Sequence, residues 1–250
     1  MTRSFPAPEG SAGGTPEQEW AGWLPRQGWP ELRVDAATAL ICAAHPDDDV
    51  LAIGGLMAQL AAGGTALRLL AATDGDASHP GSAVLSPPEL ARRRIAETAD
   101  ALAELGVRPE GVTRLGLPDG GLAAREAELT RAVVQVAAGT ELVLAPWEGD
   151  AHPDHDALGR AAAVAAAAHG IPLLAFPVWT WHWAAPGDPR VPWGRARRIA
   201  VGAAIRARKR AAVARFVTQV RPLSPAPEDA VVLPPEVLAH FDRDLEVVFA

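Results

Sequence analysis

Tyrosine and asparagine are absent from the 250 residues, and cysteine occurs only once, as Cys42. A single cysteine excludes an internal disulfide, so histidine and carboxylate groups must hold any bound metal. No apolar run approaches the roughly 20 residues of a membrane helix, and neither a membrane span nor a signal peptide is expected. The formal net charge of −7 offers no basic surface for a phosphate backbone, so nucleic acid is not an expected partner. The cytoplasm is the expected compartment.

The chain is long enough for one α/β domain with a full core. Residues 1–17, rich in Pro, Gly, Ser and Glu, predict a flexible tail before a single domain over residues 18–250. Apolar runs predict strands at residues 39–44, 67–72, 112–115, 142–145, 173–178 and 195–201, and a closing edge strand at 245–249. Helical patterns lie between them, at residues 50–62, 87–106, 122–138, 156–168 and 203–220. This alternation predicts a mostly parallel sheet with helices on both faces.

Two segments are rich in tryptophan, which occurs eight times. Residues 20–29 are expected to form a short arm that packs on the domain. Residues 179–193 suit either a lid that stacks on a sugar or an irregular loop that packs against the core.

Polar residues follow four of the predicted strands, at residues 45–49, 73–76, 117–120 and 147–155. In open α/β sheets the carboxyl ends of the strands carry the chemistry. The four clusters are therefore expected to meet at one rim.

The cluster His45-Pro46-Asp47-Asp48 has the residues of a zinc site. A His and a carboxylate three residues apart on a tight turn can reach one ion, which makes His45 and Asp48 the first predicted ligands. The alternative is a solvated group of carboxylates at a helix N-terminus.

The cluster His152-Pro153-Asp154-His155 opens the helix after the fourth strand. One of its two histidines would be a third ligand and leave the other imidazole spare, unless both merely cap and line the start of the helix. Two such clusters on one rim favour a single Zn²⁺ per chain.

The remaining polar groups suit the hydrolysis of an amide. Beside zinc-activated water, Asp47 is the candidate general base. His152 can stabilise negative charge on the carbonyl oxygen, and Asp47 or His152 can protonate the departing amine. Asp154 is expected to orient one of the histidine rings.

These motifs resemble those of the LmbE-like, or PIG-L, family of zinc-dependent de-N-acetylases. The resemblance runs from Ala39 to Gln219 and rests on AHPDDD with Gly54-Gly55, TDG at 73–75, Arg94-x-x-Glu97, LPDGGL at 117–122, HPDH at 152–155, and Lys209-x-x-Ala-Val with Thr218-Gln219. Asp49 and Ala52 depart mildly from the family pattern. The Tyr that some members have just before the second motif is missing here, which leaves zinc and His152, or a Trp N–H, to stabilise the oxyanion.

The resemblance implies a three-layer Rossmann-like α/β fold. It also implies that His45, Asp48 and His155 are the zinc ligands, that Asp47 is the base and that His152 is the electrostatic or acid group. By the same resemblance, Arg94 and Asp119 bind polar groups of a sugar. Without it, Arg94 is better explained by a surface pair with Glu97.

The predicted function is removal of an N-acetyl or other N-acyl group from a small-molecule amino sugar or glycoconjugate. One alternative is a metal-dependent amidase acting on a thiol or peptide conjugate. Another is a non-catalytic sugar or nucleotide binder, although the chain has no G-x-G-x-x-G motif after the first strand. The sequence leaves open whether the chain forms a homo-oligomer.

Overall fold

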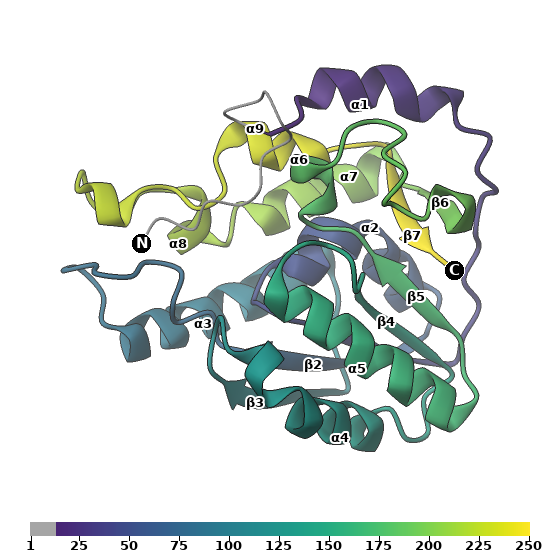
Figure 1. Ribbon diagram of the computed structural model, residues 1–250, viewed down its shortest axis with the longest axis horizontal. Coiled ribbons are helices and arrows are strands. Elements are labelled where there is room, and N and C mark those ends of the chain that lie inside the picture. The colour runs from purple at the N-terminus through teal and green to yellow at the C-terminus, as the bar shows by residue number, and fades with distance from the viewer. Residues whose placement is uncertain (1–13) are drawn as a thin grey trace.

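The computed structural model describes residues 14–250 and is built around a seven-stranded sheet with the order β3-β2-β1-β4-β5-β7-β6 (Figure 1). The first five strands in sequence are parallel to one another, whereas β7 is antiparallel to both of its neighbours. The strands are β1 (Thr38–Ala43), β2 (Ala66–Thr73), β3 (Gly111–Leu117), β4 (Leu142–Pro146), β5 (Leu173–Phe176), β6 (Ala196–Ala200) and β7 (Leu245–Phe249). The prediction of a mostly parallel α/β sheet is confirmed.

Helices cover both faces of this sheet and give three layers (Figure 1). One layer contains α2 (Asp48–Ala62), α3 (Pro87–Leu105) and α7 (Ala203–Val213), which contact one another. The other contains η2 (Leu122–Arg125), α4 (Glu126–Val136) and α5 (Pro153–His169). The short elements are α1 (Glu17–Trp23), η1 (Leu24–Arg26), α6 (Thr180–Trp183), η3 (Trp193–Arg195), α8 (Val217–Val220), η4 (Pro227–Asp229), α9 (Pro235–Leu238) and η5 (Ala239–Phe241).

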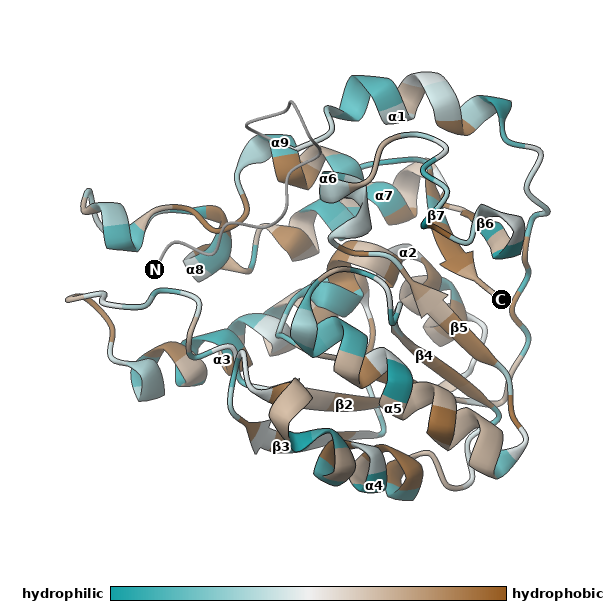
Figure 2. Ribbon diagram, viewed as in Figure 1, coloured by the Kyte–Doolittle hydropathy of each residue, from teal (hydrophilic) through white to brown (hydrophobic). Residues whose placement is uncertain are grey.

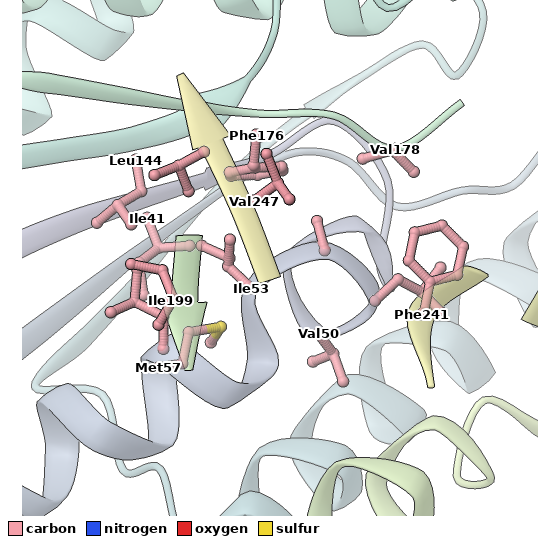
Figure 3. Packing of buried hydrophobic residues seen from close by; sticks show 14 of the residues in the cluster. Ile41, Val50, Ile53, Met57, Leu144, Phe176, Val178, Ile199, Phe241 and Val247 are labelled. Atoms are coloured by element: carbon pink, nitrogen blue, oxygen red, sulfur yellow. The ribbon is translucent and has the colours of Figure 1, made fainter. Parts of the chain in front are cut away.

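Side chains along the inner strands point alternately to the two faces of the sheet, and this divides the hydrophobic core into two clusters. In β1, Ile41 belongs to the cluster beneath α2, whereas its neighbours Leu40 and Cys42 belong to the cluster beneath α5. Successive strand residues point to opposite faces, so one strand serves both clusters. The inner strands accordingly carry the apolar colour in Figure 2, and Figure 3 shows part of the first cluster.

Local signals place the ends of the long helices. Ser86 and Glu89 form a capping box at the start of α3. Gly106 ends α3 in a left-handed conformation with φ of 71°, which suits a residue without a side chain. The start of α5 at Pro153 is earlier than predicted, because His152 serves as its N-cap.

Two predicted elements near the C-terminus differ from the structure. The predicted helix 203–220 is wrong as one unit, because α7 ends at Val213 and the chain turns so that Phe216 is fully buried before α8 begins. The prediction that the last strand lies at an edge is also wrong. β7 is inserted between β5 and β6, and its last four residues are buried, so the sheet ends at β3 and β6.

The two tryptophan-rich segments pack on each other. Trp20 of α1 lies 5.1 Å from Trp181 and 5.9 Å from Trp193, measured between ring centroids. Residues 20–29 therefore form the expected arm on the domain. Trp181 and Trp193, in the 179–193 segment, pack against it as part of the core. The predicted tail, residues 1–17, lies mostly outside the described residues, and within the described part Thr15 is buried and donates to the Ala184 carbonyl.

In the part of the chain from residue 14 onward, no helix combines the length and the apolar character needed to cross a membrane.

Candidate functional site

The loops that follow β1, β3 and β4, together with the first turns of α2 and α5 and with Arg94 of α3, bring the predicted site residues together. His45 lies between β1 and α2, Asp119 follows β3, and residues 150–155 form the end of the loop after β4 and the start of α5. All of the predicted site residues are buried except Asp119, whose side chain is nevertheless only 1% exposed. The two distant histidine motifs thus meet at the rim where the sequence placed them.

Three candidate ligands form a tight triangle. His45 Nδ1 lies 3.3 Å from His155 Nε2 and 3.4 Å from Asp48 Oδ2, and His155 Nε2 lies 3.3 Å from Asp48 Oδ1. Zinc bonds of 2.0–2.1 Å in a tetrahedron separate neighbouring ligand atoms by about 3.3 Å. The side chains are therefore arranged as ligands of one small cation.

His152 lies beside this triangle. Its ring nitrogen, with those of His45 and His155, belongs to a group of atoms within 4.8 Å of one another that could hold a metal ion. The backbone N–H of Asp154 donates to His152 Nδ1 over 3.2 Å, so the proton of a neutral ring is carried by Nε2. Burial, together with His155 and His45, lowers the pKa of His152 to about 3.

Asp150 fixes the ring of His155, a role that the sequence reasoning missed. Its Oδ2 accepts from His155 Nδ1 at 2.7 Å. The same carboxylate also accepts from the backbone N–H groups of Val178, Trp179 and Thr180 and from the Thr180 hydroxyl. The carboxylate two residues before His152 was visible in the sequence, but its partners come from the chain beyond β5.

Asp154 and Asp119 lie on the other side of His45. His45 Nε2 is 3.2 Å from Asp154 Oδ2 and 3.3 Å from Asp119 Oδ1. These three residues form a second group that could hold a cation. However, Asp154 already accepts from the N–H groups of Gly120 and Leu122, so its carboxylate is suited to receive the His45 Nε2 proton.

Asp47 is held by Arg94. Arg94 Nη2 donates to Asp47 Oδ2 at 2.9 Å and to the Pro46 carbonyl at 3.1 Å, and Nη1 donates to the Gly75 carbonyl. Burial raises the pKa of Asp47 to about 7, against the lowering effect of Arg94. Glu97 instead binds the backbone N–H and hydroxyl of Thr218, so a surface pair does not explain Arg94.

The carboxylates make this rim attract positive charge. Burial alone would lower the pKa of His155, but Asp48 and Asp150 raise it to about 9. Burial likewise opposes the shift of His45, whose pKa is raised well above its usual value by hydrogen bonds with Asp119, Asp154 and Asp48. A field that favours protons on both imidazoles also favours a cation that displaces them.

A cavity of about 550 Å³ opens onto the triangle. Both residues expected to bind a sugar, Arg94 and Asp119, line it. Gln219, named in the sequence only as part of the family pattern, lines it as well, and so does Trp179 of the segment that suited either a lid or a packed loop. Residues 227–241 complete much of the remaining wall.

Comparison with known proteins identifies relatives of this arrangement. The deacetylase of the A40926 pseudoaglycone shares the fold with a TM-score of 0.64 at 23% identity, over 86% of this chain and 97% of its own. N,N'-diacetylchitobiose deacetylase from Pyrococcus horikoshii gives a TM-score of 0.55 at 20% identity, over 72% of this chain and 70% of its own. The conserved protein TT1542 from Thermus thermophilus gives a TM-score of 0.53 at 28% identity, over 72% of this chain and 79% of its own.

Among curated proteins no sequence matches the chain. The sequence model described as PIG-L: GlcNAc-PI de-N-acetylase matches residues 40–166, which is just over half of the 250 residues and includes both histidine motifs. The chain therefore belongs to the PIG-L family of GlcNAc-PI de-N-acetylases.

Proposed function

We propose that the protein is a Zn²⁺-dependent hydrolase that removes an N-acyl group, such as acetyl, from an amino sugar or glycoconjugate. The observation that carries this proposal is the triangle of His45, Asp48 and His155, with separations of 3.3–3.4 Å and with Asp47 next to it. Family membership and the deacetylases that share the fold support the same chemistry.

The residues of the triangle fit one zinc ion per chain. Two imidazole nitrogens and one carboxylate are a ligand set typical of catalytic zinc, which keeps a further position open. Asp150 and the pair Asp154 and Asp119 accept the outer protons of His155 and His45 and so orient the ligand atoms inward. When bound, the ion would lower the pKa of water and polarise the amide carbonyl.

Asp47 carries out the proton transfers, and His152 stabilises the charge that develops on the carbonyl oxygen. Asp47 accepts a proton from water as the water oxygen bonds to the carbonyl carbon, and Arg94 holds the carboxylate in place meanwhile. The Nε2–H of His152 donates to the carbonyl oxygen as negative charge develops there. The C–N bond then breaks, the nitrogen receives the proton from Asp47, and a carboxylic acid and a free amine leave.

Arg94 also supports recognition of a polar substrate. Its Nε is buried and has no hydrogen-bond partner within residues 14–250, although the side chain lines the cavity. Asp119 lies on the same cavity and offers acceptor oxygens.

A screen for acetate release tests the function. Zinc-loaded protein is incubated with N-acetylglucosamine and its glycosides, before and after treatment with a chelator and again after zinc is restored. We expect acetate release that is lost with the metal and returns with it. Undiminished release after complete metal removal, or no release from any of these compounds, would contradict the proposal.

Asp150→Asn should weaken zinc binding by about 10-fold to 100-fold, because the His155 ring loses its carboxylate partner. Competition with a chromophoric chelator measures the affinity. Glu148→Gln is the matched control, since Glu148 lies in the same loop but is exposed. Equal affinities for the two variants would show that Asp150 does not position the ligand.

A further inference from the structure

The cavity has an apolar wall at one end. Its members are all less than 9% exposed and belong to one core cluster, and they are Leu51, Val178, Leu233, Val237 and Phe241. Figure 3 shows Val178 and Phe241 at the opposite end of that cluster from Met57 and Ile199. Core side chains that line a cavity present an apolar surface which only an apolar group can cover without cost.

The C-terminal part of the chain forms most of this wall. Val237 of α9 and Phe241 at the end of η5 lie about one helical turn apart, and Leu233 lies two residues before α9. All three line the cavity. Leu51 lies one turn after Asp48 on α2, which brings the wall to within one helical turn of the metal ligands. Val178 adds the chain just after β5, and its own N–H is one of the groups that bind Asp150.

Three polar side chains of the cavity, those of Arg94, Asp119 and Gln219, are held around a different segment. Arg94 binds the carbonyl of Gly75, Asp119 binds the N–H of Ala77, and Gln219 binds the hydroxyl of Ser78. The polar side is thus formed around residues 75–78, whereas α2, α9 and the chain after β5 form the apolar side. The triangle of ligands lies where both sides meet.

From this division we propose that the preferred substrate carries an aliphatic N-acyl chain longer than acetyl. The inference rests on the proposed function, with the amide carbon at the triangle, the sugar toward residues 75–78 and the acyl chain along the apolar wall. The bond cleaved is unchanged, so water and the amide yield a fatty acid and the free amino sugar. An alkyl group on the sugar is the other source of an aliphatic chain, and the test separates the two.

The first measurement compares kcat/KM for N-acetyl-, N-butanoyl-, N-hexanoyl- and N-octanoylglucosamine on the zinc-loaded protein. Each added methylene should raise kcat/KM about threefold until the wall is covered. The kcat/KM values for the octyl and methyl glycosides of N-acetylglucosamine should differ by less than those for the N-octanoyl and N-acetyl compounds. A preference for acetyl, no dependence on acyl length, or a gain confined to the octyl glycoside would overturn the proposal.

The second measurement uses binding, which does not depend on turnover. Calorimetry with the Asp47→Asn variant should give a Kd for N-octanoylglucosamine at least 10-fold below that for N-acetylglucosamine. Failure of all four amides to react would contradict the proposed function, while this binding ratio would still decide whether the wall takes the chain. Equal Kd values for the two amides would show that the apolar wall does not bind the acyl chain.

Val237→Thr tests the wall itself, because threonine keeps the shape of valine and adds a hydroxyl. The ratio of kcat/KM for the octanoyl over the acetyl substrate should fall about tenfold. Val133→Thr is the matched control, since Val133 is also buried but lies in the other core cluster. The ratio is independent of the amount of folded enzyme, so an equal fall in both variants would contradict the assignment.

Discussion

Asp47→Asn should lower kcat about 1,000-fold and leave the zinc content unchanged. An amide cannot accept the proton from water, and general bases typically contribute 100-fold to 10,000-fold. Asparagine keeps an oxygen for the hydrogen bond from Arg94 Nη2, so the surrounding contacts persist. Asp47 lies outside the triangle of ligands, which is why metal binding should survive. Steady-state kinetics and metal analysis of the same preparation measure both quantities.

Asp100→Asn provides the control for this experiment. Asp100 is exposed on α3, the helix that also carries Arg94, and the substitution should change neither kcat nor zinc content. Retention of full activity by Asp47→Asn would remove Asp47 from the mechanism. A parallel loss of zinc would instead make it a ligand.

The meeting of the candidate ligands could be predicted from sequence because it depends on short motifs at the ends of neighbouring strands. His45 and Asp48 lie three residues apart on one turn, and β1 and β4 are neighbouring parallel strands whose carboxyl ends share a rim. Most of the strands and helices could also be predicted, because apolar runs and helical periodicity are patterns within single segments. The fold and the two histidine clusters therefore followed from patterns within single segments.

The supporting contacts could not be predicted, because they join segments far apart in the chain. Asp150 finds its donors about 30 residues later, and the Glu97–Thr218 contact spans 121 positions. Nor does apolar periodicity distinguish an edge strand from an inserted one, so β7 was misplaced. Phe216 continued the helical pattern of α7 in sequence, but α7 ends at Val213 and Phe216 is fully buried in the turn that follows.

Lys209, known from sequence only as part of a family pattern, forms a buried ion pair with Glu246 of β7 at 2.6 Å. The Glu246 carboxylate also accepts from the N–H groups of Gly55 and Leu56. These donors lie just after Ile53, where α2 has non-helical dihedral angles of −132° and 20°. Glu246 thus caps the second half of the helix that begins with Asp48, and Lys209 neutralises its charge.

Lys209→Met should lower the free energy of unfolding by about 3–5 kcal/mol, because it leaves the Glu246 carboxylate buried without its cation. Urea denaturation measures the change. Arg206→Met, one turn earlier on α7, breaks a more exposed pair with Asp242 and should cost less than about 1 kcal/mol. Adding Glu246→Gln to Lys209→Met should restore part of the loss, because the buried charge is gone and one backbone donor keeps an acceptor. If Lys209→Met cost no more than Arg206→Met, Glu246 would not depend on Lys209, and its hydrogen bonds to α2 would suffice to hold it.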